Sequence, residues 1–321
     1  MQSTVAIGSL TLKNRVFLAP MAGITNLPMR LIAREGGASL TFTEMVSVNG
    51  LTREGRKSFD LLKTTSGDRP IGMQLFGDEP EMLAEAARLV EEYGELLDIN
   101  MGCPVKKVVG TGAGSALMKD PLKVGRIVRS VRKATRLPFT VKIRTGWVCG
   151  DDTFPEVGRI AQEEGCDAIT LHPRSRAQMF EGKADWAKIG ELKSTLKIPV
   201  IGSGDLFSAD DVVRMLSETG CDAVMVARGA MGNPWLFREA LALLAGETPV
   251  PPTVAERLAV ARRHLELFTE FEGGRVALME MRKHLSWYSK GLPGAAQFRA
   301  AVNRIEDAAE LVGAMEEFFN G

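Results

Sequence analysis

The chain has 321 residues, of which 45% are hydrophobic and 25% are charged, a composition typical of a globular protein with a sizeable core. Its 40 basic and 40 acidic side chains cancel, so any contact with a nucleic acid must come from a local patch. The sequence contains no run of about 18 apolar residues and no signal-peptide pattern, so we expect a cytoplasmic protein without a membrane span.

Short apolar runs rich in β-branched residues alternate with helical patterns along the first 244 residues. We predict eight strands, at 16–19, 40–43, 71–75, 97–100, 139–143, 168–171, 200–201 and 223–226. We predict helices between most of them, at 26–35, 80–93, 121–135, 153–164, 185–194, 208–219 and 235–244. The stretch between the second and third strands is irregular. This alternation predicts an α/β fold with a parallel sheet.

An internal repeat favours a closed barrel over an open sheet. The sequence Gly-Cys-Asp-Ala followed by a β-branched residue enters both the sixth and the eighth strand, at 165–169 and 220–224. Repeated β/α units are the building blocks of a (β/α)₈ TIM barrel. Cys166 and Cys221 begin these strands, so we expect both in the core. The four cysteines contain no C-x₂-C pair, which argues against a metal site and against disulfides.

The pattern changes after residue 244. Residues 245–252 contain three prolines and read as a linker, and no strand-like run follows them. Three helices are predicted in the tail, at 253–272, 275–290 and 295–319, and Thr253 with Glu256 forms a capping box at the first. The sequence therefore predicts a barrel domain at 1–244, a linker at 245–252 and a small helical domain at 253–321.

Polar and glycine-rich residues follow seven of the eight predicted strands, at the end where barrels of this kind form their active sites. The segments 202–204 and 227–229 offer backbone N–H groups that suit a phosphate, although glycine also serves in plain turns. Lys142 and Arg144 alternate on one strand and so point to the same side. We expect an anionic partner there, such as a flavin, over the alternative of a solvated charged edge.

Cys103 and the three histidines are the remaining candidates for chemistry. The turn at 100–104 exposes Cys103, whose thiol is mostly protonated at neutral pH and can donate a proton, although loop cysteines are more often inert. His172 follows the sixth strand, which favours a ligand contact over a structural hydrogen bond. His264 and His284 lie on tail helices, where we expect the first at the surface and the second in a basic stripe.

Six segments together resemble the tRNA-dihydrouridine synthase family, particularly its bacterial B-type branch. They lie at 18–23, 74–77, 98–104, 141–147, 172–176 and 202–205, and the sequence Asn-Met-Gly-Cys-Pro at 100–104 is the most specific. The resemblance covers essentially the whole chain. The sequence departs from the family pattern at Ser203, where asparagine is usual, and at Pro173, where glycine is usual.

The resemblance implies reduction of uridine to dihydrouridine in tRNA, with FMN at the rim of the barrel and NADPH as the reductant. Cys103 is implied as the proton donor to C5 of a flipped-out uracil, and Asn100 and Arg144 as the residues that hold the uracil. The implied FMN contacts are Pro20, Met21, Ala22, Gln74, Lys142, His172, Ser203, Gly204, Asp205, Ala227 and Arg228. The helical tail is implied as the RNA-docking domain.

A base reaches a barrel site only after extrusion from folded RNA, which requires phosphate-binding residues around the mouth. Arg174 and Arg176, with Lys106 and Lys107 beside Cys103, are candidates for this role. The tail offers further cations and aromatics together, although a solvated face with buried aromatics is an equal alternative: Arg282, Lys283, His284, Lys290, Arg299, Trp287 and Tyr288. No obligatory protein partner is evident.

Two other functions remain possible from the residues. One is an FMN barrel enzyme that acts on a free small molecule, which would have no use for a basic helical tail. The other is a non-catalytic RNA-binding protein, which would have no use for Cys103, Lys142 and His172 at one rim.

Overall fold

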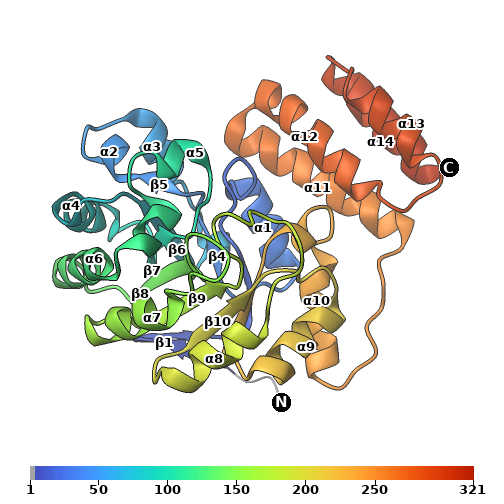
Figure 1. Ribbon diagram of the computed structural model, residues 1–321. Coiled ribbons are helices and arrows are strands. Elements are labelled where there is room, and N and C mark those ends of the chain that lie inside the picture. Colours follow the sequence, from blue (N-terminus) through green and yellow to red (C-terminus); the bar gives the residue numbers. More distant parts are fainter. Residues whose placement is uncertain (1–3) are drawn as a thin grey trace.

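The computed structural model describes residues 4–321, so the first three residues of the predicted barrel domain lie outside the described range (Figure 1). Eight parallel strands form a nearly closed barrel, which confirms the predicted (β/α)₈ fold. Their order around the barrel is β3 (Val16–Leu18), β11 (Ala223–Val226), β10 (Val200–Ser203), β9 (Ala168–His172), β8 (Phe139–Arg144), β7 (Leu96–Met101), β6 (Ile71–Phe76) and β4 (Thr41–Phe42). A parallel bridge between Phe17 and Leu40 brings the first and last strands together.

Helices cover the outside of the barrel between successive strands. They are α1 (Leu27–Glu35), α4 (Pro80–Val90), α6 (Pro121–Ala134), α7 (Phe154–Glu163), α8 (Ala187–Thr195), α9 (Ala209–Thr219) and α10 (Trp235–Leu244). Their ends follow local side-chain chemistry: Ser208 and Asp211 form a capping box at the start of α9, and Gly220, with φ +65°, ends it. All seven predicted helices are present, with ends shifted by at most a few residues.

Several short elements near the N-terminus are not visible as sequence patterns. A hairpin of β1 (Val5–Ile7) and β2 (Leu10–Leu12) packs into the cluster of barrel-interior side chains that includes Phe17 and Phe42. The stretch predicted to be irregular contains β5 (Val46–Ser47), α2 (Val48–Leu51), α3 (Arg56–Asp60) and the 3₁₀ helix η1 (Ser66–Asp68). Elements of two to five residues are too short to show a period.

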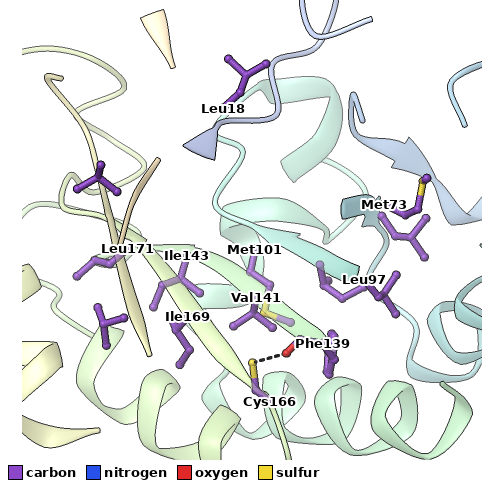
Figure 2. Close-up of a cluster of buried hydrophobic side chains, with 14 of the residues drawn as sticks. Leu18, Met73, Leu97, Met101, Phe139, Val141, Ile143, Cys166, Ile169 and Leu171 are labelled. Carbon is purple, nitrogen blue, oxygen red and sulfur yellow. Dashed lines mark hydrogen bonds between the residues drawn. The ribbon is translucent and has the colours of Figure 1, made fainter. Parts of the chain in front are cut away.

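The main core lies between the strands and the surrounding helices, and Figure 2 shows part of it around Leu97, Val141 and Ile169. The Cys166 thiol donates a hydrogen bond to the carbonyl oxygen of Phe139 at 3.5 Å, and both Cys166 and Cys221 are buried as predicted. All four cysteines are free thiols. No helix within residues 4–321 combines the length and apolar character that crossing a membrane requires.

The tail contains four helices, so the prediction of three is wrong. They are α11 (Val254–Glu272), α12 (Gly274–Tyr288), α13 (Ala295–Val302) and α14 (Ala308–Asn320), and they lie beside the barrel next to α1 and α10 (Figure 1). The predicted last helix breaks because the Asp307 side chain accepts a hydrogen bond from the backbone N–H of Glu310 and starts a new helix. Thr253 and Glu256 form the predicted capping box.

The two tail histidines lie in the tail core, so both predictions for them are wrong. His264 and His284 are each 0% exposed, with ring centroids 4.3 Å apart, and the Tyr288 hydroxyl lies 3.0 Å from His264 Nδ1. Burial, aided by the charge of Lys283, lowers the pKa of both histidines, so they are neutral at neutral pH. His284 and Tyr288 are therefore not available to a nucleic acid.

Candidate active site

A cavity of about 450 Å³ opens at the carboxyl ends of the barrel strands. Most residues singled out from the sequence line it together: Pro20, Met21, Ala22, Asn100, Cys103, Lys142, Arg144, His172, Ser203, Gly204, Asp205, Ala227 and Arg228. Gln74 is the exception among the predicted cofactor contacts, because it lies behind the cavity wall and is only 1% exposed. The convergence of strand ends at one rim, which the barrel geometry predicts, brings these residues together.

Backbone and side-chain hydrogen bonds fix the loop that carries Cys103. The backbone N–H of Cys103 donates to Asn100 Oδ1 at 2.8 Å, and its carbonyl oxygen accepts from the backbone N–H and the hydroxyl of Ser115 at 3.1 and 2.9 Å. The thiol itself is half-buried at the cavity wall. Burial raises the pKa of Cys103 above its ordinary value, although Arg144 and Lys142 oppose the shift, so the thiol is protonated at neutral pH.

Arg144 connects three segments around the cavity. Its Nε donates to the carbonyl oxygen of Gly102 at 2.9 Å, and its Nη1 donates to the carbonyl oxygens of Ser175 and Met179 at 2.9 and 2.8 Å. Its guanidinium carbon lies 5.5 Å from the ring centroid of Phe180. Most of the hydrogen-bonding capacity of Arg144 thus holds the protein together, and Nη2 remains for a ligand.

Lys142 gives the cavity a cation with no ion-pair partner among residues 4–321. Burial and the nearby charge of Arg144 together lower the pKa of Lys142 to about 8, although Asp98 and Cys103 act in the opposite direction. An ammonium group in this position favours an anionic or electron-rich ligand, because such a ligand would offset the cost of burying the charge.

Arg174 was predicted to bind phosphate, but its side chain is engaged within the protein. Its side chain is buried, and its two terminal nitrogens bind the two carboxylate oxygens of Asp205 at 2.9 and 2.7 Å. It also donates to the carbonyl oxygens of Glu181 and Gly182. The prediction failed because the partner carboxylate lies 31 residues away in sequence. Arg174 therefore braces the loop after β9 against the loop after β10.

His172 is held neutral in the cavity wall. Arg174 Nη1 lies 3.3 Å from His172 Nε2, and a guanidinium only donates, so Nε2 accepts and the ring proton is on Nδ1. Burial lowers the pKa of His172 well below its ordinary value, and the surrounding cations Lys142 and Arg144 lower it further. His172 can therefore donate one hydrogen bond from Nδ1 without bringing a charge.

The ends of β10 and β11 form a tight backbone cradle. Gly204 has φ +116°, and an added Cβ would lie 2.9 Å from His172 Cδ2, so only glycine fits there. The Ser203 hydroxyl donates to the carbonyl oxygen of Met225 at 3.0 Å, which commits its proton to the protein. The backbone N–H groups around Gly204 and at the start of the 3₁₀ helix η3 (Arg228–Ala230) remain suited to a phosphate group.

Several residues at or behind the cavity were missed in the sequence. Phe180 and Phe207 line its mouth with 49% and 51% exposure, and Arg228 lies 4.6 and 5.3 Å from their ring centroids. Met45 lines the wall. Asp98 lies behind it, and its only sequence signal is a charged residue inside an apolar strand. Exposed aromatics in loops carry no pattern that sets them apart.

The cations predicted to bind RNA fall into two groups. Lys106 and Lys107, on helix α5 (Lys106–Val109), are exposed beside Cys103, and Lys290 is exposed on the tail. Arg176 lies over the Trp147 ring, 4.6 Å from its centroid, and Arg299 is half-buried. In contrast, Arg282 donates to the carbonyl oxygen of Ile305 and Lys283 donates to that of Gly23, so both are engaged within the protein.

Comparisons with known proteins show the family of this chain. The family model described as dihydrouridine synthase matches residues 17–320. The tRNA-dihydrouridine synthase B of Xanthomonas axonopodis pv. citri is 42% identical over 316 residues, which cover 98% of this chain and 95% of that protein. The B enzyme of Pasteurella multocida gives the same identity and coverage, and a probable tRNA-dihydrouridine synthase of Rickettsia conorii is 39% identical over 318 residues, 98% of this chain and 96% of that protein.

A solved structure shares the fold at low sequence identity. The complex of 2-naphthoyl-CoA reductase with 2-naphthoyl-CoA superposes with a TM-score of 0.59 and 11% identity, over 77% of this chain and 52% of that chain. At this identity the similarity concerns the barrel architecture alone.

Proposed function

Since this chain belongs to the dihydrouridine synthase family, we propose that it reduces the C5=C6 bond of uridine in tRNA, with bound FMN and with NADPH as the reductant. The observation that carries this proposal is the position of Cys103, a protonated thiol at the wall of a cationic cavity. The names of the relatives support tRNA as the substrate, and a cytoplasmic location fits such a substrate.

The residues of the cavity fit a flavin mononucleotide. Apolar side chains such as Met21 and Ala22 suit a planar ring, the unpaired ammonium of Lys142 suits its electron-rich N1–C2=O edge, and the glycine-rich ends of β10 and β11 suit its phosphate. His172 and Arg228 complete the proposed contacts, with Pro20, Ser203, Gly204, Asp205 and Ala227. Bound FMN would supply the hydride that uracil C6 receives.

Cys103 is the proposed donor of the proton that C5 receives. Its raised pKa keeps the proton on sulfur until charge develops on the base, which is the property required of a general acid. The thiolate left behind faces Arg144 and Lys142, whose charges stabilise it. Arg144 Nη2 and the second amide hydrogen of Asn100 are the donors still available to hold the uracil.

RNA docking is assigned to the exposed cations around the mouth and on the tail. Lys106 and Lys107 are exposed beside Cys103, half-buried Arg176 lies over the Trp147 ring, and exposed Lys290 lies just after α12, where phosphates of an extruded nucleotide and its neighbours would contact them. In this proposal residues 1–244 form the catalytic domain, 245–252 the linker and 253–321 the docking domain. Arg174 has no direct role in binding RNA.

Reduction of an RNA lacking dihydrouridine tests the function. We expect purified protein to be yellow, to release FMN on denaturation, and to convert uridine in tRNA from a deletion strain when NADPH is supplied. Mass spectrometry of nuclease digests would locate the product by its gain of two hydrogens. A colourless protein that FMN does not reconstitute, or a yellow protein that reduces free pyrimidines but not tRNA, would contradict the proposal.

A further inference from the structure

We infer that Asp98 is a positioning residue for Cys103, because its carboxylate sets the orientation of two buried amides, Gln74 and Asn100, that together hold the Cys103 loop. The importance of this series of hydrogen bonds for catalysis rests on the proposed function, in which Cys103 donates a proton. The orientation of the amides rests only on hydrogen bonds within the protein.

The series begins at a carboxylate that is 0% exposed in the middle of β7. Its two oxygens accept hydrogen bonds from Gln74 Nε2 at 2.7 Å and from the Thr140 hydroxyl at 2.6 Å. An ionised carboxylate can only accept. Gln74 must therefore turn its NH₂ group toward Asp98, and the carbonyl oxygen of the same amide must point the other way.

The second link passes this orientation to Asn100. The Gln74 Oε1 atom accepts from Asn100 Nδ2 at 3.0 Å, which turns the oxygen of Asn100 toward the loop. There Asn100 Oδ1 accepts the backbone N–H groups of Gly102 and Cys103 at 3.2 and 2.8 Å. Reversing either amide would place donors against donors or acceptors against acceptors in a buried site, which is costly.

Asn100 supplies the only side-chain acceptor for these two loop N–H groups among the described residues. The carbonyl groups of the same loop are held separately, by Arg144 at Gly102 and by Ser115 at Cys103. Without Asp98, no carboxylate fixes the Gln74 amide, and a reversed Gln74 would place its NH₂ group against that of Asn100, which would weaken the anchor on the N–H side of the loop. A proton donor displaced by about 1 Å can lose on the order of 10²-fold in rate.

Asp98→Asn tests the inference, because it keeps the shape of the side chain but allows either amide orientation. Thr140→Val is the matched control, since it removes the other hydrogen bond to Asp98 and leaves the link to Gln74 intact. We expect Asp98→Asn to speed hydrogen exchange at the Gly102 and Cys103 amides of the oxidised holoenzyme. We expect it also to slow reoxidation of the reduced enzyme by tRNA about 10-fold or more, while reduction by NADPH changes little.

Several outcomes would overturn the inference. One is unchanged exchange at these amides in Asp98→Asn, and another is an equal effect of Thr140→Val, which would indicate general loosening of the core. Should Asp98→Asn not fold, Gln74→Leu, which removes the middle link, must raise exchange at the same two amides for the inference to stand. If the wild-type enzyme does not reduce uridine, the proposed function fails, while hydrogen exchange still decides whether Asp98 orients the loop.

Discussion

The ammonium group of Lys283 lies 2.6 Å from the carbonyl oxygen of Gly23 and thereby connects tail helix α12 to the loop after the first barrel strand. The N–H of Gly23 donates to the Glu44 carboxylate, and its φ of +72° requires glycine or a strained residue. The same loop contributes Met21 and Ala22 to the cavity. The helical tail is thus in direct contact with a loop proposed to hold the flavin.

Lys283→Ala should therefore loosen the tail and the flavin together. Loss of a charge-assisted hydrogen bond at a partly exposed site is expected to cost about 1 kcal/mol of unfolding free energy, or roughly 2–4 °C in Tm. We also expect FMN affinity to fall. Differential scanning fluorimetry and flavin-fluorescence titration measure both effects, with exposed Lys290→Ala as the control. Equal Tm and FMN affinity in the two variants would show that the hydrogen bond to Gly23 is not important.

Lys290→Glu should weaken tRNA binding, because this exposed cation is placed to bind a phosphate. Removing one phosphate-binding cation should reduce the slope of log affinity against log salt by about 1. Arg282→Ala is the matched control, since its guanidinium binds the carbonyl oxygen of Ile305 inside the tail. Filter binding across a salt series distinguishes the two variants. An unchanged slope in Lys290→Glu would place RNA docking elsewhere.

The strands and the cavity residues were predictable because a parallel barrel has one active rim and strand ends are visible as breaks in apolar runs. The FMN-contact residues predicted from the sequence line the cavity at that rim for this reason, with Gln74 as the exception. The failure at Arg174 has a different origin. Whether a cation is exposed depends on a partner, here Asp205, that only the folded chain brings near.

The tail histidines show a second limit of sequence reasoning. His264 follows Ala261 by three residues and precedes Phe268 by four, so helical spacing alone places it on the buried face of α11. The prediction that His264 lies at the surface overlooked this spacing and was wrong. The break in the last helix needed the cap at Asp307, which resembles any other surface aspartate in sequence.

Lys142→Met should weaken FMN binding by about 10-fold or more, because it removes the unpaired cation of the cavity. The pKa of about 8 adds a pH dependence to this effect. In the flavin-free protein the ammonium loses its proton as the pH rises through about 8, so affinity for an anionic ligand should fall over that range in wild type. The Lys142→Met variant should lack this fall. If FMN affinity changes with pH in the same way in both proteins, the proposed role of Lys142 is wrong.

The reoxidation rate with tRNA should fall as the pH drops below about 6, because Asp98 takes up a proton there. Burial raises its pKa to about 6, opposed by the hydrogen bonds from Gln74 and Thr140 and by the charge of Lys142. Above this pH the carboxylate only accepts and fixes the Gln74 amide; below it, the acid can also donate, so Gln74 is no longer fixed from this side and its support of Asn100 weakens. Single-turnover rates of reoxidation from pH 5 to 8 measure this effect. The rate of the Asp98→Asn variant should not show the fall below pH 6.

Cys103→Ala should keep the fold, the FMN and the reduction by NADPH, but slow uridine reduction by roughly 10²- to 10⁴-fold, the usual contribution of a positioned general acid. The loop bonds to Asn100 and Ser115 involve only the backbone of Cys103, so alanine leaves them in place. Cys103→Ser should retain partial activity, limited by the higher pKa of a hydroxyl. Exposed Cys149→Ala is the control for loss of a thiol.

Single-turnover oxidation of the reduced enzyme by tRNA isolates the step in which Cys103 acts, because cofactor loading and NADPH binding are already complete. A slower reoxidation step with unchanged tRNA affinity would place the defect in proton delivery. This outcome is expected because the loop holds the Cys103 thiol at the cavity wall and burial keeps it protonated. If the alanine variant reoxidises as fast as wild type, another group donates the proton, and the assignment of Cys103 is wrong.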